Sequence, residues 1–306
     1  MRVIVHADDC GLSAGITDAI LRCHDAGLLQ RTSVVANGAA WDYAVRLLQQ
    51  RPRLAVALHL NLFEGRPLSP PEEVNLLVDR HGRFTRGFVG LWAKCVTHAR
   101  IRNQLRLELR RQVERFVTAF GDRGALTVDG HVHYHVIPPV FDCLLELCAE
   151  YPIAAVRLPR EPLYWPPMLA GGRPRLANVA KNLVLRALSH RAVRALPATS
   201  LATTDAFIGV LGTGNMTLAH IAAALEHLRV RSTARTVEIL FHPGRARAHE
   251  ADLWSDRPRL RTLYLSPDRD REAELLCSPA LAQLLQLYGG TPGGHRMPSS
   301  PSELLQ

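Results

Sequence analysis

The chain has 306 residues, of which 47% are hydrophobic, enough for one large α/β domain or two smaller ones. The formal net charge of +9 comes from arginine, since only Lys94 and Lys181 are lysines. The most basic segment, residues 157–194, lacks the interleaved aromatic residues that stack on bases, which argues against a nucleic-acid-binding protein. No apolar run is long enough to span a membrane, and the N-terminus has no secretory pattern, so we expect a cytoplasmic protein.

The six cysteines form no CxxC pair and no dense framework. This usage is typical of reduced, mostly buried thiols, which agrees with a cytoplasmic location. The histidines, rather than the cysteines, are therefore the candidate metal ligands.

The first predicted element is a buried strand over residues 2–7, which ends in the adjacent carboxylates Asp8 and Asp9. Two neighbouring carboxylates repel each other, so they persist most easily where a cation or a proton relieves the repulsion. The alternative is that one of them only caps the following helix, at residues 14–26, although Ser13 could also do this.

A second candidate site residue, His59, lies near the end of the third strand. In this part of the chain we predict strands at residues 32–38 and 54–62, a long loop at 64–85, and helices at 40–50 and 100–120. A single histidine in a strand is usually a satisfied core residue. Its position at a strand end matches that of the Asp8–Asp9 pair, and this coincidence favours a functional site.

Three further histidines, His131, His133 and His135, alternate with other residues directly after an apolar run. In an extended chain all three side chains would share one face. Imidazoles clustered near the end of a strand indicate a metal or acid–base site. The alternative is an exposed strand end that binds no ligand.

The rest of the chain continues the alternation, and His242 directly follows the last strand. The remaining predicted elements are helices at 138–150, 176–196, 217–229 and 271–286 and strands at 154–158, 205–209 and 236–241. The basic helix at 176–196 is either an ordinary helix with a solvated outer face, a lid over the site, or a surface for an anionic membrane. We predict a single domain over residues 1–288 and a disordered tail over residues 289–306.

The alternation of strands and helices predicts a parallel sheet with crossover helices. With about seven strands, our first choice is a (β/α) barrel-like fold related to the TIM barrel, and an open doubly wound sheet is second. Either fold brings the C-terminal ends of the strands together at one mouth. The polar residues that map to this mouth are Asp8, Asp9, His59, His131, His133 and His242.

The chemistry of these residues points to hydrolysis of an amide or an ester. One carboxylate and two imidazoles form a common open metal site, which Asp9, His59 and His131 match. An ion there would lower the pKa of water and polarise a carbonyl oxygen, while Asp8 accepts a proton. His242, with His133 as second candidate, would protonate the leaving nitrogen. Zn²⁺ suits the imidazoles, and Mg²⁺ or Mn²⁺ stay open.

Four segments resemble, in order and spacing, the YdjC-like carbohydrate deacetylases, which include chitooligosaccharide and hopanoid-associated deacetylases. The segments are residues 7–13 (ADDCGLS), 58–67 (LHLNLFEGRP), 129–133 (DGHVH) and 241–244 (FHPG). Residues 157–161 and 204–207 also look like family positions. The resemblance covers roughly residues 2–278.

This resemblance implies a (β/α) barrel-like fold, a divalent metal ion, usually Mg²⁺, and removal of acetyl from an N-acetylated sugar. By motif, Asp9, His59 and His131 match the metal ligands and Asp8 the base. His242 matches the histidine of the late His-Pro-Gly motif, and its role as an acid is our own inference.

Two positions depart from the family pattern: Cys10 stands where phenylalanine is usual and Thr17 where asparagine is frequent. Both flank the site, so they bear on substrate preference more than on chemistry. The histidine stretch looks closer to the chitooligosaccharide type, whereas residues 66–73 and 157–162 look closer to the hopanoid-associated type.

The leading hypothesis is a metal-dependent N-deacetylase acting on an amino sugar in an oligosaccharide or on a lipid. The alternatives are a metal phosphoesterase and a silent protein that binds a sugar or lipid headgroup around a structural metal. The Asp8–Asp9 pair argues against a silent protein, because a structural site does not need the spare carboxylate. As partners, the sequence predicts no nucleic acid, predicts membrane contact through residues 176–196 if the substrate is lipid-linked, and leaves a homodimer open.

Overall fold

The structure is a computed structural model that describes residues 1–165, 175–196 and 201–289. The disordered tail that we predicted from residue 289 onward lies, apart from Gly289, outside the described residues.

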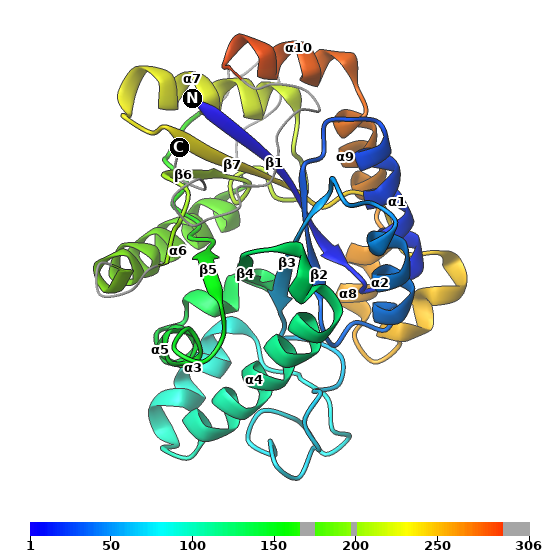
Figure 1. Ribbon diagram of the computed structural model, residues 1–306, viewed down its shortest axis with the longest axis vertical. Helices are drawn as coiled ribbons and strands as arrows, with labels where there is room; N and C mark the ends of the chain where they lie inside the picture. The colour runs from blue at the N-terminus through cyan, green and yellow to red at the C-terminus, as the bar shows by residue number, and fades with distance from the viewer. Residues whose placement is uncertain (166–174, 197–200, 290–306) are drawn as a thin grey trace.

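Seven parallel strands form one curled sheet in the order β5-β4-β3-β2-β1-β7-β6, a half-barrel flanked by helices (Figure 1). The strands are β1 (Arg2–Cys10), β2 (Arg31–Val35), β3 (Ala55–Leu60), β4 (Leu126–Gly130), β5 (Ile153–Val156), β6 (Ala206–Ile208) and β7 (Thr236–Phe241). Ala202, which precedes β6 in the chain, pairs with β5 through an isolated parallel bridge to Ala155. The predicted barrel-like α/β fold is confirmed.

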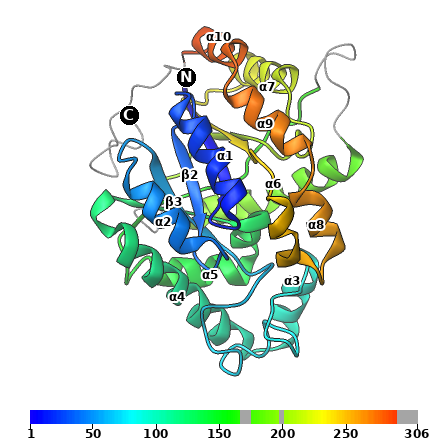
Figure 2. The ribbon, with the colours of Figure 1, turned by 90° about the vertical axis from the view of Figure 1, so that its right-hand side faces the viewer.

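The helices lie around the outside of the sheet (Figures 1 and 2). They are α1 (Ala14–Asp25), α2 (Trp41–Gln49), α3 (Phe88–Thr97), α4 (Ile101–Phe120), α5 (Pro138–Leu147), α6 (Leu176–Ala195), α7 (Leu218–Arg231), α8 (Pro258–Tyr264), α9 (Asp268–Leu276) and α10 (Pro279–Leu287). The sequence did not predict α3 and α8. The single helix predicted at 271–286 is two helices, because Pro279 disfavours a helical Ser278 and instead starts α10, which Ser278 caps.

The histidine stretch is not extended, so our prediction that His131, His133 and His135 share one face is wrong. The strand ends at Gly130, and His131–Val136 form a 3-10 helix, η2, in which His133 has a left-handed φ of 59°. The chain folds back so tightly that a Cβ on Gly130 would lie 2.7 Å from Nδ1 of His135. Instead of facing the site, His135 bonds through Nε2 to the carbonyl oxygen of Arg157, 2.8 Å away.

The inside of the curled sheet is polar, although it is buried. His6 on β1, Arg31 on β2, Asp129 on β4 and Glu238 on β7 are all less than 9% exposed. Buried charges are rare unless they are paired, so this interior indicates a built site rather than a packing core.

The turn after β7 gives a test of how the strand ends dock on the helices. Gly244 has a φ of +80°, and a Cβ there would lie only 2.0 Å from the Cβ of Ala19 on α1. Gly244→Ala should lower the free energy of unfolding by about 2–4 kcal/mol, from left-handed strain and overpacking together. Urea denaturation measures this change.

Gly27→Ala is the matched control, because Gly27 also has a positive φ but nothing within 4 Å of its Cβ position. It should cost only the backbone strain, about 1 kcal/mol. Equal losses in the two variants would contradict the tight contact between Gly244 and α1.

Candidate metal centre

An irregular end of β1 brings two adjacent carboxylates to one place. Successive side chains of a regular strand point to opposite faces. The register between β1 and β2 shifts between Ala7 and Cys10, and Asp9 has a φ of 74°, which is uncommon for a residue other than glycine. As a result, Asp8 and Asp9 both line the same cavity.

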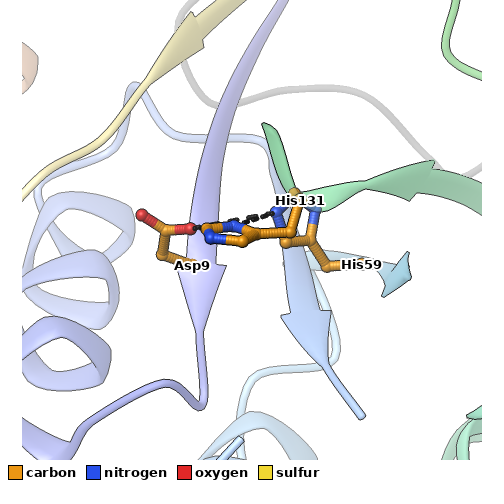
Figure 3. Close-up of side chains that lie close together, drawn as sticks. All are labelled: Asp9, His59 and His131. Atoms are coloured by element: carbon orange, nitrogen blue, oxygen red, sulfur yellow. Dashed lines mark hydrogen bonds and ion pairs between the residues drawn. The ribbon is translucent and has the colours of Figure 1, made fainter. Parts of the chain in front are cut away.

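Asp9, His59 and His131 converge from β1, β3 and the start of η2 (Figure 3). Asp9 Oδ1 lies 3.1 Å from His131 Nδ1 and 3.8 Å from His59 Nε2, and the two ring nitrogens are 3.3 Å apart. All three side chains are buried, and one ligand atom of each lies within 4.8 Å of the others. This donor set and spacing fit one divalent cation.

Two carboxylates orient the imidazoles from behind. His59 Nδ1 donates to Asp129 Oδ1 at 2.5 Å, and His131 Nε2 donates to Glu64 Oε1 at 2.9 Å. The opposite ring nitrogens of both histidines therefore point toward Asp9. Histidines that bind metals almost always donate their other ring N–H in this way.

The electrostatic field of the cluster also favours a cation. Burial lowers the pKa of His131, but its interactions with the carboxylates of Asp9 and Glu64 together outweigh burial and raise it to about 10. Asp9 Oδ1 is buried and lacks a hydrogen bond of good geometry, although His131 is near. A buried carboxylate oxygen without such a bond is costly unless a positive charge faces it.

The C-terminal part of the chain closes over this cluster. Tyr264 on α8 donates to Oε1 of Glu64, and Trp254, in the 3-10 helix η4 (Ala248–Trp254), donates to Oε2. From α9, Arg269 Nη2 donates to Asp9 Oδ2 at 2.9 Å. η4 and α8 thus restrain the carboxylate of Glu64, and α9 restrains that of Asp9.

Behind Asp8, the buried Arg157 bonds three carboxylates. Its Nη1 and Nη2 lie 2.8 and 2.9 Å from the oxygens of Asp8, while Nη2 lies 2.9 Å from Asp129 Oδ2 and Nε 2.7 Å from Glu238 Oε1. Burial raises the pKa of Asp8, but the charges of Arg157, His59 and His6 together outweigh burial and keep the pKa well below its usual range.

A second group with metal-ligand side chains is formed by His6, Asp8 and Asp129. Arg157 already bonds both carboxylates of this group, so their charge is offset without an ion. The Asp9, His59 and His131 cluster is therefore the better candidate centre.

The cluster lies on a cavity of about 420 Å³, a size typical of ligand sites. The cavity brings together the six residues expected at the strand mouth, namely Asp8, Asp9, His59, His131, His133 and His242. Burial lowers the pKa of His242 to about 4 and that of His133 well below its usual range. The roles of these residues as ligands, base and acid stay predictions.

Sequence reasoning gave no role to several residues that shape the site. Arg157 directly follows a strand, and Glu238 is the lone charge within an apolar strand, so the sequence pattern could have identified both as site residues. Tyr264 and Arg269 come from helices that have no regular relation to the strand ends, and nothing in the sequence pointed to them.

Comparison with known proteins places the chain in a family. A family model described as YdjC-like protein matches residues 2–287. The chain belongs to the YdjC-like family. A carbohydrate deacetylase of Mus musculus is 29% identical to this YdjC-like chain over 299 residues, which are 94% of the chain and 92% of the mouse protein.

Two bacterial relatives match about half of this YdjC-like chain. A carbohydrate deacetylase of Thermoanaerobacter pseudethanolicus and a chitooligosaccharide deacetylase of Serratia marcescens are each 33% identical to it, and each match covers 52% of the chain. The matches cover 62% and 60% of these relatives' own lengths. A putative cellobiose-phosphate cleavage protein from Enterococcus faecalis superposes with a TM-score of 0.71 at 20% identity, over 95% of this chain and 96% of that one, which shows the fold alone.

The carboxylates behind the histidines can be tested by metal affinity. Glu64→Gln and Asp129→Asn should each weaken Zn²⁺ binding about 10- to 100-fold, because each imidazole loses its charged acceptor. Competition with a chromophoric chelator measures the affinity. Glu73→Gln is the control, since Glu73 is exposed and, among the described residues, its carboxylate bonds Arg111 alone. Wild-type affinity in both variants would contradict the orienting role.

Proposed function

We propose that the chain is a metal-dependent carbohydrate N-deacetylase, which hydrolyses the acetamido group of an N-acetylated amino sugar. The observation that carries this proposal is the convergence of Asp9, His59 and His131 beside a second carboxylate, Asp8, in one cavity. A purely structural metal site has no need of the second carboxylate. The names of the relatives, carbohydrate deacetylase and chitooligosaccharide deacetylase, support the same activity.

In this proposal Asp9, His59 and His131 hold a divalent ion. Such an ion supplies Lewis acidity, which polarises an amide carbonyl and makes water a better nucleophile. The two imidazoles suit Zn²⁺, and the family resemblance favours Mg²⁺.

Asp8 is the proposed base. Its Oδ2 lies 3.9 Å from His59 Nε2, so it reaches the edge of the metal cluster. Arg157 keeps Asp8 ionised, which leaves a carboxylate ready to accept a proton from water in the cavity. The bidentate ion pair also fixes the direction in which the carboxylate points.

His242 is the proposed donor to the leaving nitrogen, and His133 is the second candidate. Both line the cavity, and both are neutral near pH 7 because burial lowers their pKa values, so the donor must first receive the proton that Asp8 takes from water. The backbone N–H of His242 donates to Glu272 at 2.6 Å, which fixes the position of this residue after β7.

A double variant tests the proposal. His59→Ala with His131→Ala should abolish both acetate release from N-acetylglucosamine oligomers and binding of Zn²⁺ or Mg²⁺, because only one of the three ligands remains. An enzymatic acetate assay and metal analysis measure the two losses. His98→Ala, at an exposed histidine, should change neither.

Acetate release from a metal-free double variant would contradict the proposal of a metal-dependent deacetylase. Phosphate release from sugar phosphates by the wild-type protein, without acetate release, would favour a metal phosphoesterase instead.

For a lipid-linked substrate, we further propose that α6 rests on an anionic membrane surface. Leu176 is 87% exposed and Leu183 50% exposed, and basic residues such as Arg191 lie on the same helix. Within the described residues, no helix is both long and apolar enough to cross a bilayer, so the contact would be peripheral.

Vesicles of phosphatidylglycerol test the membrane contact at low salt. The wild-type protein should cosediment with them, and Leu176→Ser with Leu183→Ser should bind several-fold more weakly, because less apolar surface enters the interface. Absence of wild-type cosedimentation would remove the membrane proposal but leave the deacetylase proposal intact.

A further inference from the structure

Two cysteines that are far apart in the sequence, Cys23 and Cys277, meet where α1 packs against α9. Cys23 lies near the end of α1, and Cys277 directly follows the last residue of α9. The two helices lie side by side in both views of the molecule (Figures 1 and 2). The Sγ atoms of the two cysteines are 3.9 Å apart, close to van der Waals contact, although 254 positions separate them in the sequence.

The surroundings of this pair turn the two sulfurs toward each other. The thiol of Cys23 donates to the carbonyl oxygen of Ala273, one turn before Cys277, at 3.6 Å. The thiol of Cys277 points at the sulfur of Cys23, so a lone pair of Cys23 Sγ faces Cys277. A disulfide bond is about 2.05 Å long, so the sulfurs have to approach each other by about 1.9 Å. Rotation about the Cα–Cβ bond of the exposed Cys277 can supply this movement.

The two thiols differ in their access to solvent. All six cysteines lie within the described residues and are free thiols, and Cys277 alone among them is exposed, whereas Cys23 is buried. Burial, with the charge of a Cys277 thiolate as a second cause, raises the pKa of Cys23, so its thiol stays protonated near pH 7. An oxidant in solution therefore reaches Cys277 first, and Cys23 is in place to react with the product.

We infer that Cys23 and Cys277 are a site of reversible covalent modification, at which a hydroperoxide such as hydrogen peroxide joins them in a disulfide bond. This inference does not depend on the proposed function. It uses two thiols and one peroxide, and it yields one disulfide and two waters.

The modification proceeds in two steps. The sulfur of Cys277 first attacks one peroxide oxygen, the O–O bond breaks, and the second oxygen leaves as water with the thiol proton. This step oxidises Cys277 to a sulfenic acid and reduces the peroxide. The sulfur of Cys23 then attacks the sulfur of Cys277, the S–O bond breaks, and hydroxide leaves as water with the proton of Cys23. The contact between the sulfurs makes this second step intramolecular, which favours it over reaction with a free thiol.

The disulfide bond fastens the end of α9 that the candidate metal centre does not hold. In the first turn of α9, Arg269 donates to Asp9 at 2.9 Å and to the carbonyl oxygen of Gly244 at 2.7 Å. These contacts attach the start of the helix to the strand ends. A bond at Cys277 attaches its other end to α1, so local opening of α9, which releases Arg269 from Asp9, becomes rarer.

Peptide mapping tests the modification directly. The wild-type protein is treated with hydrogen peroxide, its remaining thiols are blocked, and it is digested with trypsin without a reductant. Trypsin releases Cys23 within residues 23–31 and Cys277 within residues 272–296, and neither peptide contains another cysteine. We expect a linked pair of these two peptides, lighter than their sum by two hydrogen atoms, which dithiothreitol separates.

Two single variants test the order of the steps. In Cys23→Ser, Cys277 should stop at the sulfenic acid, which dimedone traps, whereas in Cys277→Ser the buried Cys23 should stay a free thiol. Cys148→Ser is the matched control and should form the link as the wild type does, because the half-buried Cys148 donates to Leu144 on its own helix.

Three results of peptide mapping would overturn the inference. The first is a Cys277 that peroxide leaves unmodified, and the second is a Cys277 that is oxidised beyond the sulfenic acid while Cys23 stays free. The third is a disulfide that joins Cys277 residues of two chains, which a gel without reductant shows as a covalent dimer.

Thermal unfolding and hydrogen exchange give the second test. The oxidised wild-type protein should unfold about 5–10 °C higher than the reduced protein, because the bond closes residues 23–277 into a loop in the unfolded chain. The amide hydrogens of α9 should exchange several-fold more slowly after oxidation. Cys23→Ser should show neither change. Equal unfolding temperatures and equal exchange in the linked and reduced wild-type protein would overturn the restraint on α9.

Discussion

The guanidinium of Arg157 is the contact on which the rest of the site depends. Arg157 directly follows β5, an edge strand of the sheet, and its guanidinium bonds carboxylates of the neighbouring strand β4 and of the more distant strands β1 and β7. Three buried carboxylates would otherwise repel each other and lose their hydration at a cost of several kcal/mol each. Arg157 therefore offsets the charge of three carboxylates in the polar interior of the half-barrel.

The same contact reaches one candidate ligand, His59, through one intermediate residue. Arg157 fixes Asp129, Asp129 accepts from His59, and His59 Nε2 is left facing Asp9. In the same way, Glu64 accepts a hydrogen bond from His131 and orients its ring. The imidazoles are thus set before any ion arrives, which reduces the entropy lost when one binds.

The extent of successful prediction follows from strand geometry. Parallel strands gather their C-terminal ends, so residues at or just after these ends, such as Asp9, His59 and His242, could be placed at one mouth from the sequence. The fold of η2 could not, because it depends on how closely Gly130 approaches His135 in space. The position of Lys181, which lines the cavity from α6, was not predicted either. The ordinary interpretation of the basic helix was a solvated outer face, and periodicity does not tell which basic side chain faces the cavity.

The centre joins the two ends of the described chain, since Arg269 bonds an aspartate 260 residues before it. During synthesis the carboxylate of Asp9 emerges from the ribosome early, and the guanidinium that restrains it emerges near the end. The carboxylate of Asp9, a candidate ligand, is therefore unrestrained by Arg269 for most of the translation of the chain. The finished geometry, and with it any selectivity between competing ions, is reached only after α9 has folded back onto β1.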